Sequence, residues 1–384
     1  MKIFIDISVL TLATFVTGIQ RVTREIIVRL IENAEAEVVL LHYNAAKHTY
    51  FQIDNEAFIR YYVKAQGIKE KMITGQEVPV STIKAGTIFF DLDAAWMSRM
   101  KRSYLLPLIK RQGAMIVAHI YDIISVTHPQ FCLERGVYNF MDFLGAHLQY
   151  ADRIITNARA TVDELELLAD KLGCMLPEYS IVPLGANFID NKPIADEDMT
   201  ERLVKIANEK PFILMVGTIE PRKNHKLLLD AYDCGLKKLG YNIIMTGYMG
   251  WNMEDFEKRL KNHPDYNNGV YHFEGQSDKE IAYLYQHARF LAFLSYTEGF
   301  GLPIIEALQR GTTVIAADVP VLREVGGENC VWFEQDNVGE FVEKVKDYSD
   351  VLKCHAENVS CKEQVVVCSW EKCGEEIISV LKNN

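Results

Sequence analysis

The sequence predicts an α/β protein of two serial domains, each built on a mostly parallel sheet. Three observations lead to this prediction. The chain has 384 residues, more than one ordinary hydrophobic core accommodates. Short apolar runs alternate with amphipathic helical segments, which is typical of strand–helix–strand units. The alternation stops at a polar stretch and then starts again, so we expect a linker over residues 188–210.

The first domain is expected over residues 1–187. Its strands are predicted from apolar runs at 3–7, 38–41, 87–90, 115–119 and 153–156. Residues 21–31 should form a helix, because their apolar side chains recur on one stripe. A helix over 161–171 should be capped by Thr161, with Glu164 three residues later. Asp6 interrupts the N-terminal apolar run, which favours a buried strand over a signal peptide.

The second domain is expected over residues 211–367, followed by a last segment over 368–384. Its strands are predicted at 212–216, 242–246, 270–273, 289–294 and 313–316. Its helices are predicted from 224 onward and at 278–288, 303–309 and 338–348, with a final amphipathic helix at 369–381. Ligands of such sheets bind beyond the carboxyl ends of the strands. Polar residues that follow strands are therefore candidate site residues.

Composition narrows the class of protein. The formal net charge is −11, and no basic excess of the kind that nucleic-acid binding requires is present. The 8 cysteines form no Cys-x-x-Cys pair and no zinc-like cluster, as expected of reduced thiols in a cytoplasmic protein. No stretch of the sequence reaches the roughly 18 uncharged apolar residues of a membrane-spanning helix.

The segment Ser295–Leu308 carries the strongest signal. A buried strand ends, a glycine-containing turn follows, and a helix starts with proline in its first turn. Such a helix start offers N–H donors and a positive dipole end to an anion. Glu298 lies in the turn and Glu306 in the helix. Both could be structural glutamates, but beside an anion site they are better suited to the hydroxyls of a sugar and a ribose.

The segment Met215–Lys226 has the same strand–turn–helix order. Arg222 could bind phosphate as a fork and Lys223 as a point charge. Together they could neutralise a diphosphate leaving group without a metal. The alternative is that a basic residue after a turn is merely solvated.

The first domain offers weaker candidates. Gly18 follows the first strand and could receive an anion or a sugar, while Arg21 could reach a phosphate or lie on the helix surface. His119 ends a strand and suits a core histidine as well as a catalytic one. Asp122, in the following loop, is the better candidate for binding a sugar hydroxyl.

These motifs resemble those of retaining glycosyltransferases of family 4, which have the GT-B fold. The resemblance rests on Glu298–Glu306, with seven residues between the two glutamates, and on segments 216–224, 246–251 and 273–278. Segment 17–22 resembles the N-terminal glycine loop of members that build bacterial surface polysaccharides. The resemblance implies two Rossmann-like domains facing across a cleft, with the last helix crossing back to the N-terminal, acceptor-binding domain.

The resemblance also implies roles for individual residues. Lys223 and Arg222 would bind the donor diphosphate, Glu306 the ribose and Glu298 the sugar. The implied donor-binding residues are Gly217, Arg222, Lys223, Gly247, Gly275, Gln276, Ser277, Glu298, Gly299, Phe300, Gly301, Leu302 and Glu306. The implied catalytic residues are His119, Asp122, Lys223 and Glu298, and the glycine loop contributes Gly18, Ile19, Gln20 and Arg21. Many members have a histidine where this chain has Tyr121, so either His119 substitutes for it or no histidine is needed.

Two further patterns stay open. Asp91-Leu92-Asp93 matches the Asp-x-Asp motif that holds a metal in single-domain glycosyltransferases, but we expect it to hold no metal and to face the acceptor. The basic residues of segment 99–111 alternate with apolar ones and suit either an anionic membrane or lipid-diphosphate surface, or a solvated helix face over a core stripe. The second interpretation is favoured. The basic residues are Arg99, Lys101, Arg102, Lys110 and Arg111.

The function implied is a retaining transfer of a hexose, with GDP-mannose favoured over UDP-sugars and dTDP-rhamnose. The acceptor would be a saccharide or a lipid-linked saccharide in bacterial surface-polysaccharide synthesis. We expect no metal, no cofactor, no nucleic acid and at most peripheral contact with the inner membrane. Two alternatives share the fold: a sugar-nucleotide epimerase and a non-catalytic nucleotide-sugar-binding scaffold. Intact Glu298, Glu306 and Lys223 argue against both.

Overall fold

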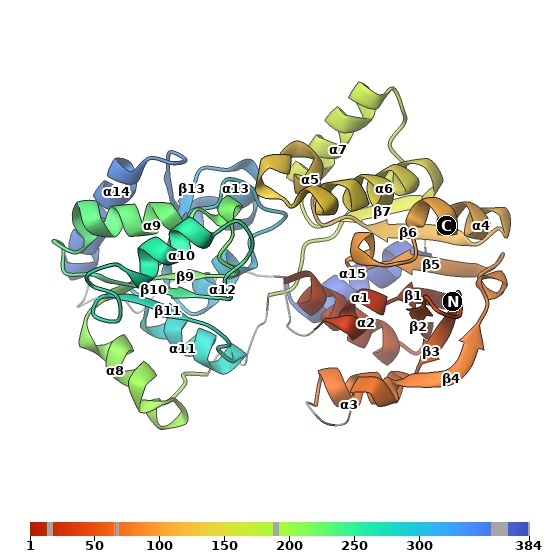
Figure 1. The fold of residues 1–384 in the computed structure, drawn as a ribbon, viewed down its shortest axis with the longest axis horizontal. Helices are drawn as coiled ribbons and strands as arrows, with labels where there is room; N and C mark the ends of the chain where they lie inside the picture. Colours follow the sequence, from red (N-terminus) through yellow and green to blue (C-terminus); the bar gives the residue numbers. More distant parts are fainter. Residues whose placement is uncertain (14–17, 65, 67–68, 187–191, 355–367, 383–384) are drawn as a thin grey trace. The chain divides into compact units, whose positions relative to one another are not determined.

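The computed structural model describes residues 1–13, 18–64, 66, 69–186, 192–354 and 368–382. It divides into two compact units, Met1–Gly185 with Cys368–Asn384, and Ala186–Val367 (Figure 1). Each unit has its own twisted sheet with helices packed on it, as expected for Rossmann-like domains.

The first unit has an eight-stranded sheet in the order β4-β3-β2-β1-β5-β6-β7-β8. The strands are β1 Lys2–Asp6, β2 Glu37–Asn44, β3 Thr49–Ile53, β4 Ile73–Val78, β5 Thr87–Asp91, β6 Met115–His119, β7 Arg153–Thr156 and β8 Glu178–Ile181. All pairs are parallel except β2–β3 and β3–β4, which are antiparallel. The sequence did not predict β3, β4 or β8. Strands β4 and β8 are edge strands with exposed polar residues, so they lack a continuous apolar run.

Eight α-helices of this unit are described: α1 Ser8–Leu12, α2 Gly18–Glu32, α3 Asn55–Tyr62, α4 Arg102–Arg111, α5 Ile124–Thr127, α6 Glu134–Tyr150, α7 Arg159–Leu172 and α15 Trp370–Lys382. The expectation that Thr161 caps α7 is wrong. The helix begins two residues earlier, Thr161 is buried within its first turn, and no side chain caps its start.

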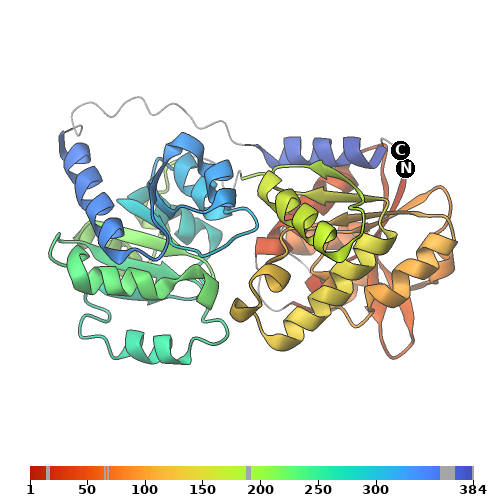
Figure 2. The same cartoon turned by 90° about the horizontal axis from the view of Figure 1, so that it is seen from above.

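Helix α15 belongs to the first unit although it follows the second in sequence (Figure 2). It packs on α2, where Arg29 forms an ion pair with Glu371 at 2.7 Å. The two helices approach so closely that a Cβ on Gly374 would lie 2.6 Å from the Arg29 Cβ. Gly185 makes a similar approach to the backbone of Trp370. The chain therefore crosses back to its N-terminal domain.

The second unit has a six-stranded parallel sheet in the order β11-β10-β9-β12-β13-β14. The strands are β9 Phe212–Val216, β10 Asn242–Thr246, β11 Val270–Phe273, β12 Phe290–Phe293, β13 Thr313–Ala317 and β14 Cys330–Phe333. Its helices are α8 Glu201–Glu209, α9 His225–Ala231, α10 Glu254–Lys261, α11 Asp278–His287, α12 Leu302–Gln309, α13 Pro320–Gly326 and α14 Val338–Cys354. The strand order reverses between β9 and β12. In open α/β sheets, ligands bind at the carboxyl ends of the strands at such a switch point.

The linker expected over 188–210 is shorter in the structure. Residues 187–191 lie outside the described residues, but α8 lies within the expected linker and belongs to the second unit. Thr200 caps α8 by accepting a hydrogen bond from the Leu203 N–H, and Leu203, Ile206 and Ala207 are buried. The exposed polar face of α8 explains why the sequence resembled a linker.

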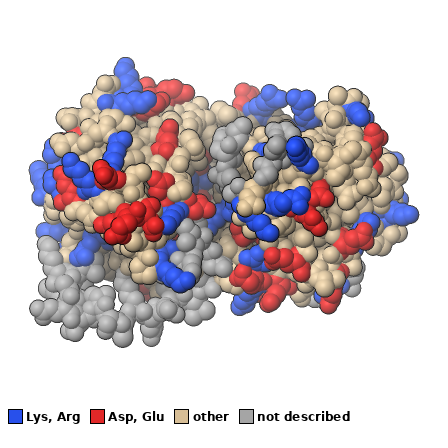
Figure 3. All heavy atoms as spheres, turned by 90° about the horizontal axis from the view of Figure 1, so that it is seen from below, with Lys and Arg blue, Asp and Glu red and all other residues tan. Residues whose placement is uncertain are grey.

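The surface carries charges of both signs. On the face that Figure 3 shows, acidic and basic side chains are interspersed over both units. This face therefore has no broad basic area of the kind that binds a nucleic-acid backbone. None of the helices in the described ranges is both long and apolar enough to cross a membrane.

Candidate functional site

Two segments that are distant in sequence meet at the switch point of the second unit. Lys223 lies in the turn after β9, and Glu298 lies in the turn after β12, 75 residues later. The Lys223 ammonium is 2.7 Å from Glu298 Oε1, and the Arg222 guanidinium is 2.5 Å from Glu298 Oε2. The predicted residues Arg222, Lys223 and Glu298 thus form one cluster, which we call the Arg–Lys–Glu cluster.

Further hydrogen bonds fix the Arg222 side chain. Its Nε lies 2.8 Å from Glu220, and its NH1 donates to the Thr297 carbonyl at 3.0 Å. The Tyr296 N–H donates to the Arg222 carbonyl at 2.7 Å, which ties the two turns together through the backbone. Protein groups therefore hold the guanidinium on three sides.

The cluster is largely buried, and Glu220 beside it balances its remaining positive charge. Burial opposes ionisation of Glu298, but the charges of Arg222 and Lys223 and their hydrogen bonds outweigh it and lower its pKa to about 2. Ser295 Oγ donates a further hydrogen bond to Glu298 Oε1 at 2.7 Å. Two cations and two carboxylates, Glu220 and Glu298, thus lie together near the ends of β9 and β12, and the cations remain donors that an anion could share.

Glycines allow the turns after β9 and β10 to pack closely. Gly217 has φ +130°, and a Cβ there would lie 3.1 Å from Lys223 Cε. Gly247 has φ +147°, and a Cβ there would lie 2.1 Å from the Gly217 carbonyl oxygen. Glycine is therefore required at 247 by the packing of the protein itself. Whether a ligand also approaches Gly217 and Gly247 stays a prediction.

The turn after β11 contains the predicted Gly275, Gln276 and Ser277. Gly275 has φ +72° and lies against the hydroxyl of Tyr248. Ser277 forms a capping box with Glu280 at the start of α11, and Gln276 donates to the same glutamate at 3.3 Å. The Ser277 hydroxyl is thus used for capping, a role that the Ser-x-x-Glu spacing indicates.

The start of α12 has the expected form. Gly301, at φ +106°, is its N-cap, no side chain caps the helix, and Pro303 lies in the first turn. Gly299 is half-buried, Phe300 is buried, and Leu302 is the first helical residue. The helix start therefore offers N–H donors and a positive dipole end to an anion.

Glu306 lies apart from the Arg–Lys–Glu cluster. It is buried one turn into α12 and accepts a hydrogen bond from the Tyr285 hydroxyl of α11 at 2.9 Å. Its proposed role toward a ribose stays a prediction.

The structure argues against a catalytic role for His119. This residue has no exposed surface, its Nε2 lies 3.1 Å from Asn157 Oδ1, and its ring stacks on Tyr121 with centroids 4.3 Å apart. Burial lowers the pKa of His119 to about 4, although the Asn157 contact opposes the shift. As the last residue of β6, it lies in the core between Asn157 and Tyr121.

Asp122 remains the accessible candidate of the first unit. It is half-buried after β6 and accepts a hydrogen bond from the Ile124 N–H at 3.0 Å. Burial and the nearby charge of Asp122 raise the pKa of Glu164, on α7, to about 6. Two carboxyl groups therefore lie near each other at this end of the sheet.

The predicted glycine loop is described from residue 18 onward, and Thr17 lies outside the described residues. Residues 18–21 form the first turn of α2. Gly18 is exposed, Ile19 and Arg21 are half-buried, and Gln20 is buried.

The Asp-x-Asp pattern is structural, and the expectation that it faces an acceptor is wrong. Asp91 forms a bidentate ion pair with Arg102 at 2.5 and 2.7 Å, and Arg102 also contacts Asp6 at 3.0 Å. Asp93 accepts hydrogen bonds from the backbone of Leu10 and Ala94, both at 2.8 Å. All three carboxylates are buried. Asp91 is thus a partner of a buried arginine, and Asp93 is an acceptor for backbone N–H groups.

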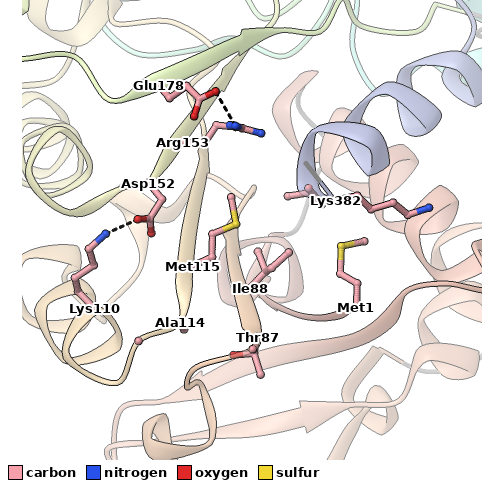
Figure 4. A pocket seen from close by; sticks show the side chains of 13 residues that line it. Met1, Thr87, Ile88, Lys110, Ala114, Met115, Asp152, Arg153, Glu178 and Lys382 are labelled. Atoms are coloured by element: carbon pink, nitrogen blue, oxygen red, sulfur yellow. Dashed lines mark hydrogen bonds and ion pairs between the residues drawn. The ribbon is translucent and has the colours of Figure 1, made fainter. Parts of the chain in front are cut away.

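A cavity of about 790 Å³ lies at the opposite end of the first sheet (Figure 4). It is lined by residues at the amino ends of the strands, such as Thr87 and Met115, and by the end of α15. Charged side chains at its wall are paired, Lys110 with Asp152 at 2.5 Å and Arg153 with Glu178 at 2.7 Å. Because ligands of such sheets bind at the carboxyl ends of the strands, this cavity is not the candidate site.

Residues 197–364 match the family model of glycosyl transferases group 1. The second unit carries a group 1 glycosyltransferase domain. Over 99% of its length the chain is homologous, at 27% identity, to the serotype-specific mannosyltransferase WbdA of Escherichia coli. The O-antigen chain mannosyltransferase B of Escherichia coli is 30% identical over 177 residues, 44% of this chain and 45% of that protein. The chain spans 45% of WbdA, less than half the length of this relative.

Solved structures show the fold. The Anabaena protein Alr3699/HepE, in complex with UDP and glucose, matches all of both chains with a TM-score of 0.67 at 15% identity. WaaG, a glycosyltransferase involved in lipopolysaccharide biosynthesis, matches all of both chains with a TM-score of 0.59 at 12% identity. The two Rossmann-like units are thus those of the GT-B fold.

The group 1 domain also contains site residues that the sequence did not single out. Glu220 and Ser295 lie inside the two segments that carried the prediction, so their position was the available signal. Tyr285 holds Glu306 from α11, and nothing in its local sequence indicated this.

Proposed function

We propose that the chain is a glycosyltransferase that moves a hexose from a nucleoside-diphosphate sugar to a saccharide or lipid-linked saccharide. The proposal is supported by the group 1 domain and by relatives named mannosyltransferases, one of them for an O-antigen chain. The observation that carries it is the Arg–Lys–Glu cluster at the switch point of the second sheet. Bacterial surface-polysaccharide synthesis is the proposed setting.

The donor diphosphate would lie against Arg222 and Lys223. Arg222 presents a planar fork and Lys223 a point charge, both suited to phosphate oxygens. The start of α12, which no side chain caps, supplies further N–H donors. It follows directly after the turn that carries Glu298. These cations and N–H groups together supply the hydrogen-bond donors that a diphosphate leaving group requires, so we propose a transfer that needs no metal.

The proposed transfer retains the anomeric configuration. The bond between the anomeric carbon and the diphosphate oxygen breaks, and the acceptor oxygen forms the new bond on the same face. The departing phosphate oxygen takes the acceptor proton. The residues act by positioning the reactants and by stabilising the charge that develops on the diphosphate.

Mannose, carried by GDP, is the favoured donor because of the relatives' names. UDP-sugars follow, because solved HepE structures contain UDP or UDP-glucose. An epimerase would consume donor without an acceptor, and a binding scaffold would consume none. Donor turnover with and without acceptor therefore separates the three functions.

The test measures turnover of GDP-mannose and of UDP-sugars by the purified protein, with and without EDTA. Lys223→Ala should lower kcat by about 10²–10³, the usual loss when one donor to a developing oxyanion is removed. Lys226→Ala is the matched control, because Lys226 is three residues away and its side chain is 72% exposed. Near-normal turnover in Lys223→Ala would overturn the assignment. Thermal stabilisation by GDP, UDP, dTDP or ADP would name the base.

A further inference from the structure

The turn after β14 contacts both turns that carry the Arg–Lys–Glu cluster. In the order of the second sheet β14 is an edge strand, and β13 separates it from β12. Residues 334–337 connect β14 to α14, and α14 packs on α9, the helix that follows β9 (Figure 1). The chain thus returns from the edge of the sheet toward the switch point.

Asp336 joins the two turns through a single carboxylate oxygen. Its Oδ1 accepts a hydrogen bond from Asn224 Nδ2 at 3.1 Å and another from the Tyr296 hydroxyl at 2.8 Å. Asn224 directly follows Lys223 in the turn after β9. Tyr296 lies two residues before Glu298 in the turn after β12. Asp336 therefore bridges the turn of the two cations and the turn of their shared carboxylate.

Tyr296 is bound through its backbone as well as through its side chain. Its N–H donates to the Arg222 carbonyl at 2.7 Å, and its carbonyl accepts a hydrogen bond from Gln335 Nε2 at 2.8 Å. Burial, followed by the hydrogen bond to Asp336, raises the pKa of Tyr296 to about 12, so its hydroxyl stays protonated and can donate. Hydrogen bonds thus join the turns after β9, β12 and β14 to one another.

The backbone conformation at both ends of the bridge suits the residues found there. Asp336 has φ +65° and Asn224 has φ +57°, a left-handed region that aspartate and asparagine adopt more readily than most residues. Asn224 also accepts a hydrogen bond from the Leu227 N–H at 3.3 Å, so the same side chain caps α9. Asp336 is exposed, so its replacement leaves no cavity and the protein should still fold.

We propose that Asp336 is a positioning residue for the donor diphosphate, because it holds together the two turns that carry the Arg–Lys–Glu cluster. It acts through Asn224 and Tyr296, without touching the donor. If the bridge were absent, the two turns would have to be ordered when the donor binds, and this ordering would weaken binding. The effect on the donor rests on the proposed function, whereas the bridge between the turns does not.

Substitutions of Asp336 separate the effect of the side chain from that of the backbone. Asp336→Gly permits the positive φ but removes both hydrogen bonds. Asp336→Asn permits the positive φ and keeps an oxygen that can accept both bonds, so it should behave like the wild type. Asn267→Gly is the matched control. Asn267 also has a positive φ, +60°, but it precedes the amino end of β11, at the opposite edge of the same sheet.

Amide hydrogen exchange of the nucleotide-free protein measures the bridge itself. In Asp336→Gly, exchange in segments 222–225 and 295–298 should be several-fold to about tenfold faster, and in Asp336→Asn it should match the wild type. Exchange in β10 should not change, and Asn267→Gly should leave both segments as they are. Unchanged exchange of the two segments in Asp336→Gly would overturn the proposal.

Donor use gives the second readout. Asp336→Gly should raise the Kd of GDP or UDP and the KM for the nucleotide sugar by about tenfold, while kcat at saturating donor and the KM for the acceptor change by less than about twofold. Tyr296→Phe should show part of this effect, and adding it to Asp336→Gly should have no further effect, because the bond is already lost.

The outcomes distinguish a positioning role from a structural one. A merely structural role would reduce the folded, active fraction, so kcat would fall while Kd and KM stayed as in the wild type, and this result would overturn the proposal. If the wild-type protein bound no nucleotide and consumed no donor, the proposed function would fail, and with it the role of Asp336 toward the donor. The exchange measurement would still decide whether the bridge exists.

Discussion

Glu298 contacts two cations that a diphosphate would also attract. Its carboxylate contacts Lys223 at 2.7 Å and Arg222 at 2.5 Å. A bound diphosphate would have to share these cations with Glu298, and the two anions would repel each other. The same carboxylate that favours binding of a sugar hydroxyl should therefore weaken binding of the free nucleotide.

Glu298→Gln should separate these two effects. Removing the negative charge frees Arg222 and Lys223, so GDP or UDP should bind several-fold more tightly than to the wild type. Sugar transfer should fall, because the proposed contact to the donor sugar is altered. Calorimetry gives Kd, and a turnover assay gives kcat. Glu328→Gln, an exposed position of the same unit, is the control. Unchanged or weaker nucleotide binding would contradict the competition.

Single residues were predictable where a motif specifies chemistry. Arg222, Lys223 and Glu298 were each identified, but their mutual contact was not, because the sequence argument placed a ligand between them. The complete burial of His119 argues against its candidacy. The alternation of side chains along a strand predicts on which face of the sheet His119 lies. It cannot show that Tyr121 stacks on the His119 ring.

At the scale of elements, the turns after β9 and β10 are held at a distance that only glycine permits. Gly217 donates its N–H to the Thr246 carbonyl, and the turn after β10 follows directly. Because the same turn carries Lys223, any displacement of the β10 turn is transmitted to the Arg–Lys–Glu cluster.

Gly247→Ala should destabilise the second unit by about 2 kcal/mol or more and lower kcat, because its Cβ would lie 2.1 Å from the Gly217 oxygen. Gly240→Ala is the control for backbone conformation. Gly240 also has a positive φ, +85°, but open space around it, so its substitution should cost only about 1–2 kcal/mol. Urea unfolding measures both. Equal losses would mean that the contact with Gly217 is unimportant.

The parallel strands were predictable because burial on both faces produces continuous apolar runs. Three of the missed elements have a common cause. Strands β4 and β8 lie at sheet edges, and α8 exposes most of its surface, so their polar residues resembled loops. The cap at Thr200 and the buried residues Leu203, Ile206 and Ala207 distinguish α8 from a linker.

At the scale of the whole molecule, each unit contains a fully buried histidine, and the two units should respond differently to acid. His225 of the second unit has no hydrogen-bond partner on either ring nitrogen among the described residues. Burial, followed by the charges of Lys223 and His272, lowers its pKa to about 3. His225 therefore binds a proton more readily in the unfolded chain than in the folded one. Neutral His225 is fully compatible with the fold above pH 6.5, and the free energy of unfolding decreases as pH falls below that value.

The first unit contains opposing groups. His119 acts in the same direction as His225, because its pKa is lowered to about 4. Burial raises the pKa of Asp93 to about 7, against the backbone N–H groups of Leu10 and Ala94, and the pKa of Glu164 to about 6. Folded carboxyl groups with raised pKa values bind protons before the unfolded ones do, so they favour the fold as pH falls.

Lowering the pH from 6.5 to 5 should therefore weaken the second unit more than the first, with His225 contributing about 2 kcal/mol. Tryptophan fluorescence during urea unfolding can follow each unit, since Trp96 and Trp370 lie in the first and Trp251 and Trp332 in the second. Replacing either pair with phenylalanine leaves reporters in one unit. His225→Leu should flatten the pH profile of the second unit alone, because the side chain then has no proton to gain. A profile that stays equally steep would place the acid sensitivity of this unit in another group.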